Sequence, residues 1–145
     1  MFDFERLDVY QHVKELNVKV LKFILSNKKL DDYLKDEWKK TNMGIILHLT
    51  EGTGRLGSAD KKHFLTLSRS CVFNCVAILE TLVGLGFVDE SLFQELYDDY
   101  EKASKMLLGM YRSYDKNNSR SREFNREYNK DFNRSDMNGF IDDSE

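Results

Sequence analysis

Residues 64–89 decide the fold, and they read FLTLSRSCVFNCVAILETLVGLGFVD. Apolar side chains recur here in steps of three and four, which is the spacing of one face of an α-helix. The stripe that this spacing predicts consists of Phe64, Leu67, Cys71, Asn74, Ile78, Leu82 and Leu85. Gly86 is placed to end the helix, and Asp89 is placed to cap the next one. A link this short joins antiparallel neighbours, so the stretch predicts a helical hairpin.

Three further segments show the same helical period, from about Leu7 to Ser26, from Asp32 to Glu51, and from Asp89 onward. Their predicted core stripes are Val9, Val13, Leu16, Val20 and Phe23; Leu34, Trp38, Asn42, Ile45 and Leu49; and Leu92, Leu96, Tyr100, Ala103, Leu107, Tyr111 and Tyr114. The chain contains no proline, as expected of long uninterrupted helices. We therefore predict an all-α fold, an antiparallel up-down-up-down four-helix bundle over residues 1–113.

Two amides, Asn42 and Asn74, fall on these predicted stripes. A buried amide needs hydrogen-bond partners and often fixes the register between helices. We expect both residues to have this structural role.

Residues 114–145 form a polar tail in which aliphatic side chains are scarce. A basic, an acidic and an aromatic residue followed by asparagine recur three times between Arg122 and Asn133. Such a segment is typical of a disordered tail. The alternative is a docking segment that presents Phe124, Tyr128 and Phe132 to a partner.

The sequence offers no convincing catalytic or cofactor site. Gly52-Thr53-Gly54-Arg55-Leu56-Gly57 matches the dinucleotide fingerprint G-x-G-x-x-G, but that motif works only between a strand and a helix. We interpret it as a glycine-containing turn between two helices. His12, His48 and His63 lack the spacing of metal ligands. We predict a non-enzyme with no metal, no cofactor and no small-molecule substrate.

The composition indicates a cytoplasmic globular protein with no membrane span. The N-terminus shows no basic region followed by an apolar stretch, and Cys71 and Cys75 lie four apart in an apolar helix. We predict two buried thiols in a reducing compartment. Residues 1–70 carry 13 basic and 10 acidic side chains, whereas residues 71–112 carry 3 and 7. The net charge of the whole chain is −3.

Four strings resemble the four-helix-bundle proteins encoded in intervening sequences of bacterial 23S ribosomal RNA genes. The opening Phe4-Glu5-Arg6-Leu7-Asp8-Val9-Tyr10 is similar to that family's Phe-x-x-Leu-x-Val-(Trp/Tyr). The centre, Ile45 to Arg55, is similar to Ser-Ile-Pro-x-Asn-Ile-Ala-Glu-Gly-x-Gly-Arg through Glu51, Gly52, Gly54 and Arg55. Residues 61–65 and 85–88 add to the likeness. Ile46 and His48 depart from it, standing where many members have proline and asparagine.

The resemblance implies a cytosolic bundle that assembles with itself into a ring, commonly of five subunits. It also implies kinship with the accessory proteins of diversity-generating retroelements, which bind RNA and a reverse transcriptase. Our first hypothesis is a non-catalytic homo-oligomer that associates with RNA or a reverse-transcriptase-like protein through Arg55, Lys61, Lys62 and Arg69. The alternative is a protein-interaction scaffold with no nucleic-acid partner, which would use the acidic residues Asp98, Asp99 and Glu101 and the tail repeat.

Overall fold

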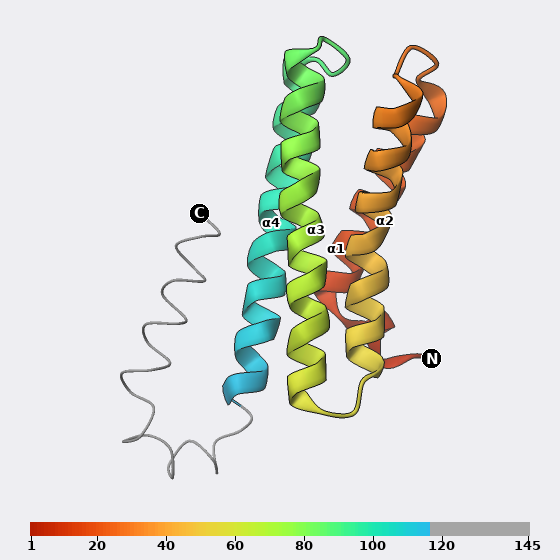
Figure 1. Cartoon of the computed structure of the whole chain (residues 1–145). Coiled ribbons are helices and arrows are strands. Elements are labelled where there is room, and N and C mark those ends of the chain that lie inside the picture. Colours follow the sequence, from red (N-terminus) through yellow and green to blue (C-terminus); the bar gives the residue numbers. More distant parts are fainter. Residues whose placement is uncertain (117–145) are drawn as a thin grey trace. The chain divides into compact units, whose positions relative to one another are not determined.

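A computed structural model describes residues 1–116, which contain a short 3-10 helix and four α-helices (Figure 1). These elements are η1 (Asp3–Arg6), α1 (Asp8–Ser26), α2 (Asp32–Gly54), α3 (Ser58–Gly84) and α4 (Glu90–Lys116). No strand occurs among these residues. The α1–α2 and α3–α4 turns lie at one end of the bundle and the α2–α3 turn at the other (Figure 1). The predicted all-α bundle is confirmed.

The predicted cap at Asp89 and the predicted helix end at Gly86 are confirmed, and Asp31 caps α2 in the same way as Asp89 caps α4. The Asp31 carboxylate accepts a hydrogen bond from the Leu34 N–H at 3.1 Å, and that of Asp89 accepts one from the Leu92 N–H at 2.8 Å. Gly86 has a φ of 82°, and the Phe87 N–H donates to the Leu82 carbonyl at 2.9 Å. That geometry is a Schellman motif, which glycine adopts without a Cβ penalty. It turns the chain sharply enough for α3 and α4 to run antiparallel.

The core stripes of α1, α2 and α4 are those the periodicity predicts, apart from small shifts at their ends. Ile24 is buried in place of Phe23 at the end of α1. Trp38, Ile45 and Leu49 of α2 are at most 1% exposed, and Leu96, Ala103 and Leu107 of α4 are fully buried. These helices alternate apolar and charged faces, so only one rotation about each axis buries the apolar side.

The predicted stripe of α3 is correct at Leu82 and wrong by one residue along the rest of the helix. The buried positions are Leu65, Ser68, Val72, Cys75, Leu79 and Leu82, whereas Asn74 is exposed. Apolar side chains surround most of this helix, so the spacing alone allowed two adjacent stripes. The stripe that is buried contains Ser68, whose hydroxyl donates to the Ile45 carbonyl of α2 at 2.6 Å. Asn74 therefore has no register role inside the bundle.

Asn42 does have the predicted role, at the centre of a buried chain of hydrogen bonds. Its Oδ1 accepts from the Tyr100 hydroxyl at 2.6 Å, and its Nδ2 donates to the Asn17 Oδ1 at 2.7 Å. Trp38 Nε1 donates to the Tyr100 oxygen at 3.0 Å, and the Cys75 thiol points at the Asn42 Oδ1 from 3.8 Å. The chain therefore joins all four helices.

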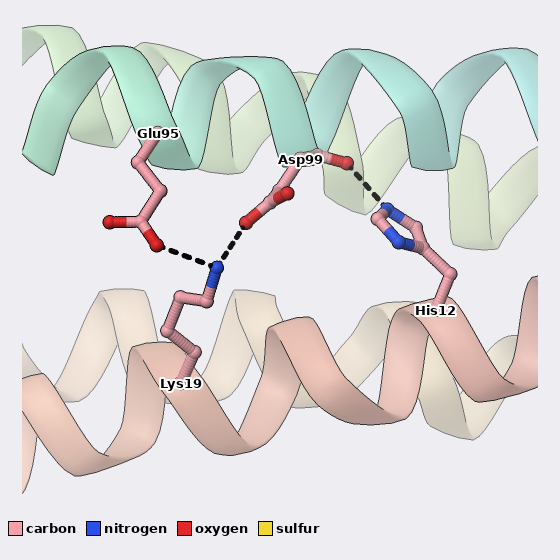
Figure 2. A network of polar contacts seen from close by, with 4 residues as sticks. All are labelled: His12, Lys19, Glu95 and Asp99. Atoms are coloured by element: carbon pink, nitrogen blue, oxygen red, sulfur yellow. Dashed lines mark hydrogen bonds and ion pairs between the residues drawn. The ribbon is translucent and has the colours of Figure 1, made fainter.

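A second set of polar contacts joins α1 to α4 near the surface (Figure 2). Lys19 Nζ lies 2.7 Å from an Asp99 carboxylate oxygen and 3.0 Å from one of Glu95. The hydrogen bond to Asp99, followed by that to Glu95, raises the pKa of Lys19 above its ordinary value. His12 Nε2 lies 2.9 Å from the Asp99 carbonyl oxygen. These contacts run in antiparallel order and close the circle of four helices.

Removing one hydroxyl from the buried chain tests its contribution to stability. Tyr100→Phe keeps the ring but leaves Trp38 Nε1 and the Asn42 Oδ1 each without one partner, which costs about 1–3 kcal/mol. We expect the free energy of unfolding in urea to fall by that amount. Tyr33→Phe is the matched control, because Tyr33 is 71% exposed and its hydroxyl should matter little. Equal effects of the two variants would contradict a special role for the buried chain.

Candidate functional site

The string Glu51 to Arg55 is the last turn of α2 together with its C-cap, rather than a flexible turn. Gly52 and Gly54 lie within the helix, and Arg55 caps it. Among the described residues only Gly86 has a positive φ, so Gly52 and Gly54 are not needed for unusual backbone angles. The interpretation as a turn between helices is therefore correct for Gly57 but wrong for Gly52 and Gly54, which need another explanation.

For Gly52 the explanation is close packing of α2 on α3. A Cβ at this position would lie 2.9 Å from the Phe64 Cβ and 3.4 Å from the Lys61 carbonyl oxygen. Gly44, two turns earlier, is similar, since a Cβ there would lie 2.8 Å from the Cys71 sulfur. The two glycines let α2 and α3 approach closely at two points about two turns apart. Gly54 has no atom within 4 Å of a built Cβ and shows no such constraint.

The Arg55 side chain connects the end of α2 to the start of α3. Its guanidinium lies 2.8 Å from a Glu51 carboxylate oxygen, and its central carbon lies 4.5 Å from the centre of the Phe64 ring. This stacking on an aromatic face is a cation–π contact. Lys61 Nζ donates to the Thr53 carbonyl at 2.8 Å, satisfying one of the carbonyls left unpaired at the end of α2. Both cations therefore hold the α2–α3 turn together.

Lys62 and Arg69 lie seven residues apart and turn toward α4. Lys62 Nζ lies 5.6 Å from the centre of the Tyr111 ring. Arg69 Nε donates to the Ser104 carbonyl at 3.3 Å, and its guanidinium carbon lies 4.7 Å from the Phe73 ring centre. The four predicted nucleic-acid contacts thus form two pairs, one at the α2–α3 turn and one along the α3–α4 seam. All four have partners within the bundle.

The cysteines and histidines have no arrangement suited to catalysis. Both thiols are free, with Cys75 buried and Cys71 only half-buried, which corrects the prediction for Cys71. Burial raises the pKa of Cys75 to about 12 and also raises that of Cys71, so neither becomes a nucleophilic thiolate easily. Within residues 1–116 no three His, Cys, Asp or Glu side chains gather as a metal site would need.

Among the described residues, His48 holds the one buried side-chain nitrogen or oxygen atom that lacks a hydrogen-bond partner. Its Nδ1 is buried and has no hydrogen-bond partner among residues 1–116. The ring lies between the two close-packing glycines of α2 and faces Phe64 at a centroid distance of 6.2 Å.

The candidate docking residues Phe124, Tyr128 and Phe132 lie outside the described residues.

Comparison with known proteins gives the family of this chain. A sequence model of the 23S rRNA-intervening sequence protein family matches residues 5–109, which is most of the bundle. This chain belongs to that family. The matched range includes α2, the α2–α3 turn and most of α4, so the Gly52 and Arg55 contacts lie inside the shared region. No curated protein matches the chain.

One solved structure supports the fold. It is a protein of unknown function from the S23 ribosomal protein family of Bacteroides thetaiotaomicron, and it shares 16% sequence identity with this chain. The TM-score is 0.66, and the match covers 71% of this chain and 97% of that one. At this identity the likeness speaks for the four-helix fold alone.

The packing role of Gly52 predicts different outcomes for the two glycines of the family string. Gly52→Ala places a methyl group against Phe64 and the Lys61 carbonyl, and we expect it to destabilise the bundle by about 1–3 kcal/mol. Gly54→Ala has room, and alanine favours a helix over glycine, so we expect it to be neutral or to stabilise by up to about 1 kcal/mol. Thermal unfolding of both variants checks this. Identical effects would rule out close packing as the reason for Gly52.

Proposed function

We propose that this member of the 23S rRNA-intervening sequence protein family is a non-catalytic, self-assembling bundle that forms a ring of five subunits in the cytoplasm. The observation that carries the proposal is the lack of charge on the solvent-facing side of α3. Ser70, Asn74, Ala77 and Thr81 are exposed there, and Leu67 and Ile78 are partly exposed. Protein interfaces are depleted of charged residues at their centre, so a surface of this kind favours association with another protein.

By length and composition α3 would also suit a membrane, but its place in the bundle argues for protein contact. It packs between α2 and α4, which carry charged side chains along their length. Charged residues are costly in hydrocarbon, so α3 could not enter a bilayer without separating from its neighbours.

The cytoplasmic part of the proposal is supported by the free thiols Cys71 and Cys75, which fit a reducing compartment.

The non-catalytic part of the proposal rests on what the polar side chains do. Asn17, Asn42 and Tyr100 are committed to the buried chain of hydrogen bonds, and Arg55 and Lys61 to the α2–α3 turn. A catalytic group needs a partner that activates it and access to a substrate. These residues serve packing instead, so we propose no substrate and no cofactor.

The mass of the particle in solution tests the assembly. Light scattering coupled to gel filtration should give about 85 kDa for a ring of five, since the chain has a mass of 17.1 kDa. Dilution should lower this mass if association is reversible. A mass of one chain at every concentration would contradict the proposal, whereas a closed assembly of another size would contradict only the number of subunits.

Association with RNA is a second proposal, favoured by how the basic side chains are held. Carbonyl oxygens hold the side chains of Lys61 and Arg69 in place, and the Tyr111 ring lies beside that of Lys62. Ordered cations suit phosphate contacts, since less side-chain entropy is lost on binding. The overall charge of −3 limits this attraction to local surfaces.

Salt dependence tests the RNA proposal. Fluorescently labelled 23S ribosomal RNA fragments should bind more tightly at 50 mM than at 200 mM salt, with a slope that reflects the number of phosphate contacts. Lys62→Gln should reduce that slope by about one, whereas Lys14→Gln, on the exposed side of α1, should leave it unchanged. Absence of binding at low salt would favour the alternative, a scaffold that binds only proteins.

A further inference from the structure

The hairpin of α3 and α4 carries negative charge without positive charge over a long stretch of the chain. Residues 70–101 contain seven acidic side chains and no lysine, arginine or histidine, although the whole chain has 22 basic residues and 25 acidic ones. The last half of α3 and the first half of α4 make up this stretch and run side by side (Figure 1). One part of the bundle surface is therefore strongly one-signed.

Two aromatic rings are partly exposed in this acidic half. Phe93 and Tyr97 lie one turn apart on α4, with their ring centres 5.6 Å apart. The bond of Arg69 to the Ser104 carbonyl fixes the register of α3 against α4. Eleven residues further along α3, on the same side of the helix as Arg69, Glu80 is level with Phe93. An exposed carboxylate therefore lies next to the rings on the α3 side.

Further exposed carboxylates lie beside the same rings on α4. At 100° per residue, Glu90, Asp98 and Glu101 fall within about 100° of the helix circumference together with Tyr97. Within residues 1–116 Glu101 is paired with Lys105 at 3.1 Å, whereas Glu80, Glu90 and Asp98 have no ion pair. We call this surface the acidic seam, and it consists of Glu80, Glu90, Phe93, Tyr97, Asp98 and Glu101.

The two edges of α4 differ in how their carboxylates are neutralised. On the α1 edge, Lys19 pairs with both Glu95 and Asp99 (Figure 2). On the α3 edge, no cation follows Arg69 until Lys102, which is on α4 itself. The fold therefore supplies its own cation to one edge and leaves the other with surplus negative charge.

We infer that the acidic seam binds an arginine-containing basic segment of another protein. Charge complementarity selects this occupant, because a surface of one sign attracts the opposite sign and repels nucleic acid and anionic lipid. Aromatic rings attract cations as well. Arginine suits both features, since its planar guanidinium pairs with a carboxylate and stacks on a ring. The inference goes beyond the proposed function and depends neither on self-assembly nor on RNA.

The same chain already makes the contact that we infer for the partner. At the α2–α3 turn Arg55 pairs with Glu51 at 2.8 Å and lies 4.5 Å from the centre of the Phe64 ring. Arg69 also lies over a ring, that of Phe73, at 4.7 Å. The acidic seam has the carboxylates and the rings of such contacts, and a partner would supply the arginine.

Fluorescence anisotropy of labelled peptides tests the inference on the full-length chain. The probe is a run of arginines separated by serines, and two matched probes carry lysine or glutamate in place of arginine. At low salt we expect the arginine probe to bind most tightly, the lysine probe more weakly and the glutamate probe not at all. Raising the salt to about 200 mM should weaken the binding of both basic probes.

Variants locate the binding on the fold. Asp98→Asn removes one exposed carboxylate of the acidic seam, and we expect it to weaken binding of the arginine probe about 3-fold. Asp8→Asn is the matched control, because it removes the same charge from an exposed site at the start of α1 and should leave binding unchanged. Tyr97→Leu keeps an apolar side chain but removes the ring, so the preference for arginine over lysine should narrow. Circular dichroism checks that each variant folds.

Three results would overturn the inference. The first is absence of binding to the arginine probe at low salt. The second is an equal effect of Asp98→Asn and Asp8→Asn, which would reduce the binding to general charge attraction. The third is a lower particle mass of Asp98→Asn in light scattering, which would make the acidic seam a contact between copies of this chain.

Discussion

The hydrogen-bonded chain from Asn17 through Asn42 to Tyr100 and Trp38 constrains the bundle more tightly than its apolar contacts do. Apolar stripes tell each helix which side to bury but tolerate rotation and sliding of a few degrees or ångströms. The polar chain does not, because each buried donor and acceptor loses its partner if one helix moves. Asn42 sits at the centre, with contacts to α1, α4 and the Cys75 thiol of α3. The register of all four helices is therefore set at one level of the core.

The family string acquires a physical meaning from the α2–α3 junction. Gly52 allows the approach, Phe64 fills the space beside it, and Arg55 covers the Phe64 ring while paired to Glu51. Lys61 adds a bond to the end of α2. Residues that suggest phosphate or nucleotide chemistry in isolation thus form a joint between two helices. In this packing the apolar stripe of α3 enters the core, and its uncharged side, which includes Ser70, Asn74 and Thr81, stays outside.

Helices that alternate charged and apolar sides could be predicted from the sequence. The stripes of α1, α2 and α4 and the helix ends at Gly86 and Asp89 depend on neighbours within a few residues, which the sequence displays directly. The predicted core stripe of α3 was wrong at Asn74, because apolar residues on both sides of this helix left Asn74 and Cys75 as alternative core positions. The interpretation of Gly52 was also wrong. The close packing that requires glycine there is against Phe64, which lies on the next helix and reaches Gly52 only after the chain has turned. The pairing of His12 and Lys19 with Asp99 joins segments about 80 residues apart and leaves no local signal.

The contacts between α1 and α4 also bear on the order in which the bundle forms. Each neighbouring pair of helices is joined by a short turn, so its contacts close small loops and arise early. The Lys19 contacts with Glu95 and Asp99 close a loop that contains most of the bundle, and the entropy of that closure is lost last. In unfolding the same seam is the natural place for the first opening. Because its ion pairs are near the surface, ionic strength should act on the rate of that opening more than on the packing of α2 against α3.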